Sequence, residues 1–118
     1  MTGTPRQTFT RGREVEHMAY RLLLSKGYHA VLCAGTTTPV DIVAWRCSGQ
    51  QIHVKTERAR TKLRTPAAVA GCYAGDLAAL RAMVVPPLAG RQLWVWDVWY
   101  GWRFFDVLSG GICEVDDV

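Results

Sequence analysis

Apolar side chains recur at the spacing of one helix face early in the chain. The positions are Val15, Met18, Ala19, Leu22 and Leu23. Steps of three and four residues predict an amphipathic helix that begins near Gly12, with Thr10 as its cap, and ends at Gly27. We expect residues 1–9, ahead of this helix, to be flexible.

Five runs rich in strand-forming residues follow the helix. Residues 28–33 are separated by a polar loop from residues 40–46, and a turn at Ser48 and Gly49 joins the latter to residues 50–56. Residues 91–99 and 102–108 flank Gly101 in the same way. These runs and turns predict one strand followed by two hairpins.

A second helix is predicted between the two hairpins. Pro66 suits its first turn, and apolar positions continue from Val69 to Met83. Gly71 and Gly75 cost about 1 kcal/mol each relative to Ala, but their small size would let the helix lie close to the sheet. Residues 110–118 are acidic and are expected to form a loose tail. The order predicts one α/β domain with a central mixed five-stranded sheet flanked by helices.

Composition excludes several classes of protein. The chain of 118 residues is 49% hydrophobic and 20% charged, and no stretch approaches the roughly 20 apolar residues of a membrane span. The N-terminus lacks the apolar region of a secretory signal, so we expect a cytoplasmic protein. The four cysteines show neither C-x-x-C pairs nor zinc-finger spacing, and we expect them to be small buried hydrophobic residues.

The net charge of +4 conceals an asymmetry between the two halves of the chain. Residues 1–64 contain 11 Lys and Arg against 4 Asp and Glu, whereas residues 65–118 contain 3 against 6. A basic half indicates a polyanionic partner such as DNA, although a solvated surface without a partner gives the same pattern. The candidate contacts to a DNA backbone are Arg11, Arg13, Arg58, Arg60, Lys62 and Arg64.

The first hairpin carries a candidate active site. Residues 53 and 55 of a strand share one face, and the hairpin would bring Asp41 beside both. Lys55 stands in an apolar strand, where its amino group must reach solvent or an acid, and Asp41 is the obvious partner. Each of these residues also has a non-catalytic interpretation. Asp41 and Lys55 would then form an ion pair without a catalytic role, and Glu16 would be an ordinary surface acid of the helix.

These residues resemble the PD-(D/E)xK nuclease superfamily and, within it, the archaeal-type Holliday junction resolvases, across nearly the whole chain. The matching positions are Arg11-Gly12-Arg13 with Glu16, Leu23, Gly27-Tyr28, Ala34-Gly35-Thr36, residues 40–44, residues 52–55, and Gly101-Trp102-Arg103-Phe104. The resemblance implies a restriction-endonuclease-like core. It also implies a homodimeric, metal-dependent endonuclease that hydrolyses phosphodiesters in branched or structured DNA, in repair or recombination.

The family scheme also implies roles for single residues. Asp41 and an acid two residues before Lys55 would hold a divalent cation, Mg²⁺ or Mn²⁺, Glu16 would complete the metal site, and Lys55 would offset developing charge. Thr36 would lie near the scissile phosphate, where such resolvases commonly have a serine. His53 stands in the place of the second acid.

The substitution at His53 leaves three alternatives open. It is a metal ligand that favours Mn²⁺ over Mg²⁺, or it marks the loss of catalysis, or it is a neutral hydrogen-bonded histidine of the strand. The second alternative describes a catalytically weakened DNA-binding protein. Glu57 shares the face of His53 but would lie about 13 Å along an extended strand from it, which disfavours Glu57 as a substitute acid.

The tryptophans of the last hairpin allow two interpretations. Trp94, Trp96, Trp99 and Trp102 resemble a base-stacking set, but Trp94 and Trp96 share one strand face, which favours a core or a dimer interface for those two.

Overall fold

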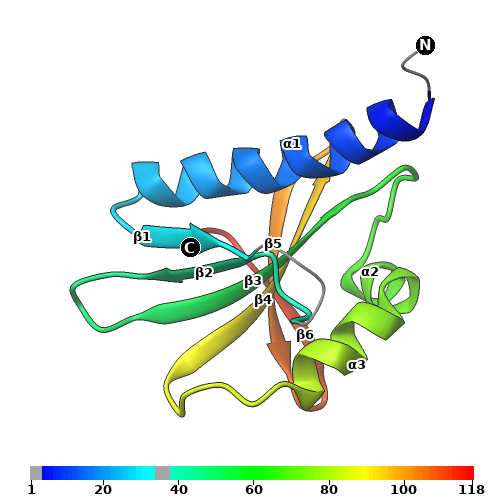
Figure 1. The fold of residues 1–118 in the computed structure, drawn as a ribbon. Helices are drawn as coiled ribbons and strands as arrows, with labels where there is room; N and C mark the ends of the chain where they lie inside the picture. Colours follow the sequence, from blue (N-terminus) through cyan, green and yellow to red (C-terminus); the bar gives the residue numbers. More distant parts are fainter. Residues whose placement is uncertain (1–3, 34–37) are drawn as a thin grey trace.

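The structure, a computed structural model, describes residues 4–33 and 38–118, with side chains described from residue 13 onward. Its elements follow the order helix, three strands, two helices and three strands (Figure 1). Their bounds are α1 Thr4–Ser25, β1 His29–Leu32, β2 Ile42–Trp45, β3 Gln51–Arg58, α2 Pro66–Cys72, α3 Ala74–Ala82, β4 Ala89–Asp97, β5 Gly101–Leu108 and β6 Gly111–Val115.

The strands form a six-stranded sheet in which spatial order follows chain order. β3 and β4 pair in parallel, whereas each other neighbouring pair is antiparallel. A parallel pair needs a long crossover connection, and α2 and α3 provide it (Figure 1). The predicted mixed sheet flanked by helices is confirmed, but its predicted count of five strands is wrong because β6 adds a sixth.

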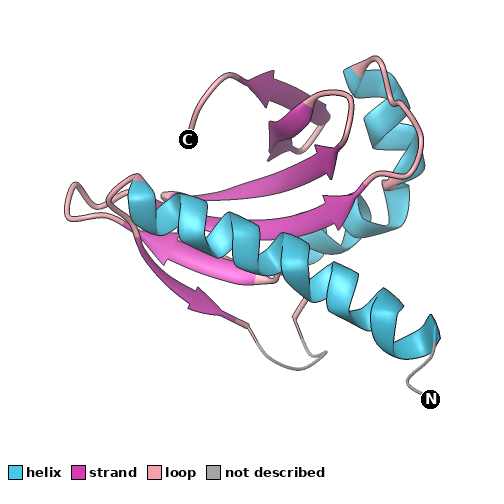
Figure 2. Cartoon of the chain, turned by 90° about the horizontal axis from the view of Figure 1, so that it is seen from above, coloured by secondary structure: helices cyan, strands magenta, loops and turns pink. Residues whose placement is uncertain are grey.

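Each face of the sheet has its own core. α1 lies across one face, and α2 and α3 lie on the other (Figures 1 and 2). Under α1, Ala19 and Leu23 pack with Ile52, Val54 and Trp94. The second core contains Val69, Leu77, Leu80, Leu93 and Val95. Because side chains alternate along β3, its odd-numbered residues, including Lys55, face α2 and α3.

α1 begins at Thr4, six residues before the predicted cap at Thr10. The expected flexibility of residues 1–9 stays a prediction; residues 4–9 belong to α1, and residues 1–3 lie outside the described residues. Pro5 falls in the first turn, where the N–H that proline lacks has no intrahelical partner. The predicted stop is confirmed: Gly27 has φ +88°, and Tyr28 N donates to Leu23 O at 3.1 Å.

The predicted second helix is two helices. Thr65 caps α2 through its hydroxyl, which accepts from Ala68 N at 3.1 Å, but Tyr73 adopts φ −113° and ψ 32° and separates α2 from α3. The interpretation of Gly71 and Gly75 as close-packing positions is wrong, since a Cβ on either would meet nothing within 4 Å.

The predicted loose acidic tail is also wrong. Residues 111–115 form β6, which pairs with β5. Two acids of the tail have basic partners distant in sequence: Glu114 pairs with Arg103 at 3.1 Å, and Asp117 pairs with Lys26. Long-range pairs of this kind hold the tail against the rest of the molecule, although its local sequence does not predict a fixed structure.

The tryptophans separate into two groups, as the shared strand face of Trp94 and Trp96 suggests. Trp94 is fully buried, and Trp96 packs edge-on against Trp102 with ring centroids 5.7 Å apart. Trp99 lies at the turn between β4 and β5 and is 48% exposed.

Two further observations concern the cysteines and the membrane. The cysteines are free thiols, but Cys47, Cys72 and Cys113 are exposed and Cys33 is half-buried, so their interpretation as buried hydrophobic residues is wrong. No helix in the described part of the chain has the length and apolar character that crossing a membrane would need.

Candidate active site

Asp41 lies immediately before β2, at the point where groups from both faces of the sheet reach it. Its backbone N–H donates to Val54 O at 2.8 Å, which continues the β2–β3 register. One carboxylate oxygen, Oδ2, accepts from Thr56 N at 2.8 Å and from Thr56 Oγ1 at 3.0 Å. These bonds fix the direction in which the carboxylate points.

Lys55 meets the same carboxylate oxygen from the α2–α3 side. Its Nζ lies 3.5 Å from Asp41 Oδ2 and 3.9 Å from Glu57 Oε2. Burial lowers the pKa of Lys55, but the negative charges of Asp41, Glu57 and Asp76 outweigh burial and raise it above its ordinary value. The lysine is therefore a fixed cation within a group of acids.

Glu16 on α1 is electrostatically coupled to this pair. Its pKa is raised, first by burial and then by the charge of Asp41, and the nearby cations Lys55 and Arg13 oppose that rise. The sequence assigns Glu16, Asp41, His53 and Lys55 to one site: Asp41 and Lys55 form an ion pair, and the charges of both act on Glu16.

His53 has other neighbours. Its Nε2 lies 3.1 Å from Gln51 Nε2, and its register partners are Val43 on β2 and Arg91 on β4. Burial, followed by the charge of Arg91, lowers the pKa of His53, so the ring is neutral near pH 7. This geometry corresponds to the neutral hydrogen-bonded histidine among the three alternatives, and the role of His53 as a metal ligand stays a prediction.

Glu57 and Asp76 form a second carboxyl pair beside Lys55. The pKa of Glu57 is raised to about 8, first by burial and then by a hydrogen bond to Asp76 and the charge of that residue. Asp76 lies in the first turn of α3, 21 positions beyond Lys55, and is not among the residues that the sequence predicts for the site. No local pattern identifies it, because only the packing of α3 against the sheet brings it to β3.

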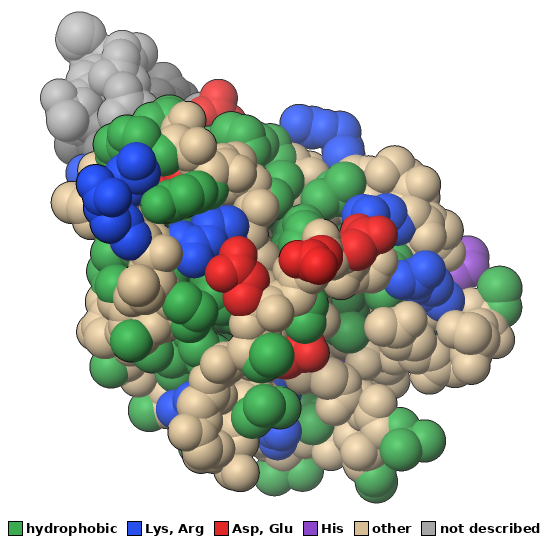
Figure 3. Space-filling view, turned by 180° about the vertical axis from the view of Figure 1, so that it is seen from behind, with side chains coloured by type: hydrophobic (Ala, Val, Ile, Leu, Met, Phe, Trp, Pro, Cys, Tyr) green, Lys and Arg blue, Asp and Glu red, His purple; other side chains and the backbone are tan. Residues whose placement is uncertain are grey.

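The predicted DNA contacts whose side chains the structure describes lie on α1 and in residues 58–64. Residues 58–64 are here called the basic segment, and its cations are Arg58, Arg60, Lys62 and Arg64. These four side chains and that of Arg13 on α1 are exposed. Figure 3 shows acidic side chains in the middle of one face of the molecule, with basic side chains on both sides. Thr36 and the side chain of Arg11 lie outside the described residues.

The site fits a divalent cation in part. Glu16 and Asp41 offer carboxylate oxygens, and the effect of Asp41 on the pKa of Glu16 shows a mutual repulsion that a cation would relieve. Among the described side chains, no three of His, Cys, Asp and Glu are grouped closely enough to hold a metal ion. Two carboxylates agree with the way proteins hold Mg²⁺, which keeps water and substrate oxygens as its other ligands.

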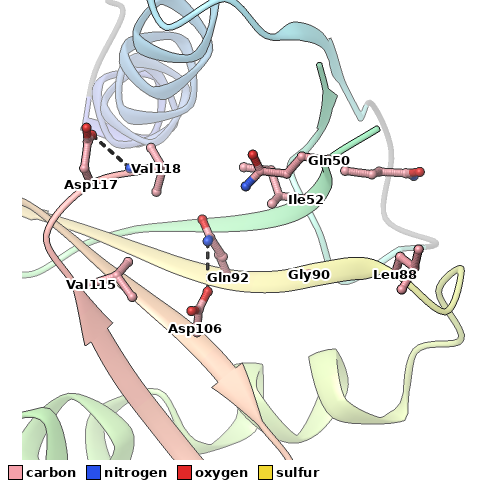
Figure 4. A pocket seen from close by; sticks show the side chains of 10 residues that line it. Gln50, Ile52, Leu88, Gly90, Gln92, Asp106, Val115, Asp117 and Val118 are labelled. Atoms are coloured by element: carbon pink, nitrogen blue, oxygen red, sulfur yellow. Dashed lines mark hydrogen bonds between the residues drawn. The ribbon is translucent and has the colours of Figure 1, made fainter. Parts of the chain in front are cut away.

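A separate cavity of about 310 Å³ lies on the α1 side of the sheet (Figure 4). Gln92 at its floor donates to Asp106 Oδ1 at 2.9 Å and accepts from Trp94 Nε1 at 2.8 Å. Glu16, Asp41, His53 and Lys55 are not among its lining residues. The cavity is therefore distinct from the candidate active site.

The fold and the geometry together define a class: an α/β protein with a resolvase-like nuclease fold, in which an acid and a lysine of a sheet hairpin form an ion pair whose charges act on an acid of the first helix. Among solved structures, the chain is similar to the Holliday junction resolvase Hjc of the archaeal hyperthermophile Archaeoglobus fulgidus. The TM-score is 0.52 at 16% sequence identity, covering 88% of this chain and 87% of the resolvase. No protein-family model and no curated protein matches the chain.

Proposed function

We propose that this protein is a metal-dependent DNA endonuclease that hydrolyses phosphodiesters in branched or structured DNA. The observation that carries the proposal is the convergence of Glu16, Asp41 and Lys55 within a fold shared with a Holliday junction resolvase. The chain also carries exposed cations on α1 and in the basic segment, and such cations bind the phosphates of DNA.

Glu16 and Asp41 are the residues that would hold the cation. Bound there, a divalent cation polarises the phosphate and stabilises its developing charge. Thr56 fixes the Asp41 carboxylate through two hydrogen bonds, so that one oxygen keeps its orientation. Oxygen ligands favour Mg²⁺ or Mn²⁺, and Mn²⁺ is favoured if His53 turns to become a ligand.

Lys55 contributes a positive charge at the reacting phosphate. Its raised pKa keeps the amino group protonated across the physiological range. The ammonium group that pairs with Asp41 in the free protein would offset negative charge on the phosphate oxygens in the transition state. A protonated lysine in this position is not itself the base that removes a proton from water.

We also propose a homodimer, since a two-fold protein matches the two-fold symmetry of a four-way junction. The aromatic strand face that the sequence offers as an interface does not serve, because Trp94 is buried inside the chain. Light scattering during size exclusion would give the mass directly, and a monomer in the presence of a junction would contradict this part of the proposal.

A second candidate function is DNA binding with weakened or absent catalysis. The observation in its favour is His53, which takes the place of an acid and hydrogen-bonds with Gln51. The basic segment and the fold would be kept for binding in this case.

Cleavage of labelled DNA separates the two candidates. Wild type, Lys55→Ala and His53→Glu are incubated with a four-way junction and with linear duplex, in Mg²⁺ and in Mn²⁺. Lys26→Ala and His29→Glu are the matched controls, because both residues lie away from the site. Cleavage by wild type that is lost in Lys55→Ala alone supports the nuclease.

Two other outcomes would not support the nuclease. Cleavage that appears only in His53→Glu supports the binding protein. No binding of either DNA in a gel-shift assay contradicts both functions, and leaves a protein that shares only its fold with the resolvase.

A further inference from the structure

The turn between β4 and β5 presents exposed apolar side chains at one end of the sheet. Val98 is 74% exposed, Trp99 48% and Tyr100 42%. Aromatic side chains in water contribute little to folding, whereas they contribute strongly to binding when a flat partner covers them.

This turn has a fixed shape. Asp97 is buried, and its Oδ1 accepts from Trp99 N at 2.8 Å and from Tyr100 N at 2.7 Å. Gly101, with φ +72°, completes the turn. In the described part of the chain, the other carboxylate oxygen of Asp97 is buried without a hydrogen-bond partner. Such a group costs stability, and costs of this kind are typical of functional sites.

The basic segment is anchored beside the turn. Ala59 N donates to Trp96 O at 2.8 Å, and Arg103 donates to Leu63 O, so both β4 and β5 hold the segment. Lys62 Nζ lies 5.6 Å from the centre of the Tyr100 ring. The four cations of the segment are exposed.

We propose that Trp99 and the cations of the basic segment form a contact surface for DNA with unpaired bases, in which Trp99 stacks on a base and the cations bind the flanking phosphates. Aromatic side chains interleaved with Lys and Arg are the combination that single strands require. This inference rests on the proposed function for DNA binding, and it names the feature of the DNA that is recognised.

Charge favours DNA over a second copy of the chain. A two-fold contact through this surface would place two segments, each with four cations, close together, and like charges in that arrangement repel. A polyanion neutralises the same charges. Arg58 lies three positions beyond Lys55, about 10 Å along β3, so the segment begins near the end of the strand that carries Lys55.

The test measures binding by fluorescence anisotropy with three labelled DNAs: a linear duplex, the same duplex with a three-nucleotide bulge, and a single strand. The variants are Trp99→Ala and Trp99→Phe. Trp45→Ala is the matched control, because Trp45 is 40% exposed on β2 and stacks on His29. Circular dichroism checks that each variant is folded.

Trp99→Ala is expected to weaken binding of the bulged duplex and the single strand about tenfold, with less than a twofold change for the linear duplex. Trp99→Phe should restore most of the affinity, and Trp45→Ala should change none. Lys62→Ala should weaken binding of all three DNAs and reduce the dependence on salt, whereas Arg21→Ala on α1 should do neither.

Three outcomes would overturn the inference. They are an equal loss for duplex and bulged DNA in Trp99→Ala, no loss for any DNA, and a change in oligomeric state that shows this turn to be an interface between copies. If wild type binds DNA normally and Trp99→Ala binds equally well, only the stacking contact is refuted. If wild type binds none of the three DNAs, the proposed function itself fails.

Discussion

The carboxyl group of Glu57 shows what burial beside another acid does to a single residue. Its pKa is raised to about 8 by burial and by Asp76, so in the folded protein it keeps its proton at pH 7. Burial is the largest cause of this rise, and the hydrogen bond to Asp76 comes second.

This shift makes stability depend on pH. In the unfolded chain the pKa of Glu57 has its ordinary value of 4.5, whereas in the folded protein it is raised to about 8. A raised pKa stabilises the fold below pH 4.5, and this contribution is lost as the pH rises through 8. The free energy of unfolding is therefore expected to fall between pH 5 and pH 8.

Glu57→Gln should remove this contribution to the slope, because an amide donates to Asp76 at every pH. Urea unfolding at pH 5 and at pH 8 measures the difference, with Glu14→Gln, on the exposed side of α1, as the control. The same slope in wild type and Glu57→Gln would contradict the assignment.

The sequence predicts part of the site for a definite reason. The hairpin register and the alternation of side chains place Asp41 beside Lys55, and helical spacing puts Glu16 on α1. Asp76 could not be predicted, since its approach depends on the angle at which α3 packs. The contact of His53 with Gln51, two positions before it on the same strand, could not be predicted either, because it depends on the rotamers of both side chains.

At the scale of elements, two glycines illustrate opposite requirements. Gly75 lies in α3 with open space around it, whereas Gly101 ends the β4–β5 turn at φ +72°. We expect Gly75→Ala to raise the free energy of unfolding by about 0.5–1 kcal/mol, because Ala has less freedom to lose on folding. Gly101→Ala should lower it by about 1–2 kcal/mol, because an L residue is strained at that angle.

Urea denaturation of the two glycine variants measures both changes. A loss of stability in Gly75→Ala would indicate a close contact for α3 that the structure does not contain. An unchanged value in Gly101→Ala would show that the turn relaxes to another conformation.

Arg103 connects three elements. It is 8% exposed, forms two hydrogen bonds of 3.1 Å with Glu114 on β6, donates to Leu63 O, and lies over the Tyr100 ring. Hydrogen bonding to Glu114 is the largest cause that raises the pKa of its guanidinium.

Arg103→Lys is expected to lower the free energy of unfolding by about 1–3 kcal/mol, because a lysine cannot reproduce the paired hydrogen bonds or the planar stacking. Chemical denaturation measures this loss, and Arg21→Lys, an exposed site on α1, is the control. Equal stability of the two variants would show that β6 and the basic segment are held by other contacts.

The elements could be predicted where their patterns are local. Val15, Ala19 and Leu23 are buried at the helical spacing that the sequence shows, and the turn at Gly49 has the positive φ of 92° that a tight hairpin requires. β6 escaped prediction because Glu114 within it and Asp117 after it have no basic residue nearby in the sequence. Their partners, Arg103 and Lys26, are distant along the chain.

At the scale of the whole molecule, one face carries acidic side chains between groups of basic ones (Figure 3). Cations on both sides would hold a DNA backbone across the acids, which would otherwise repel it. A divalent cation bound by Glu16 and Asp41 would remove the remaining repulsion at the reacting phosphate.

Mn²⁺ binding followed by electron paramagnetic resonance tests the central claim most directly, because free Mn²⁺ is measured without any DNA. Wild type is expected to bind one Mn²⁺ per chain, with affinity reduced at least tenfold in Asp41→Asn and in Glu16→Gln. Glu14→Gln, two positions away on α1, should bind as wild type does. Equal binding by wild type and Asp41→Asn would contradict a cation site at Glu16 and Asp41.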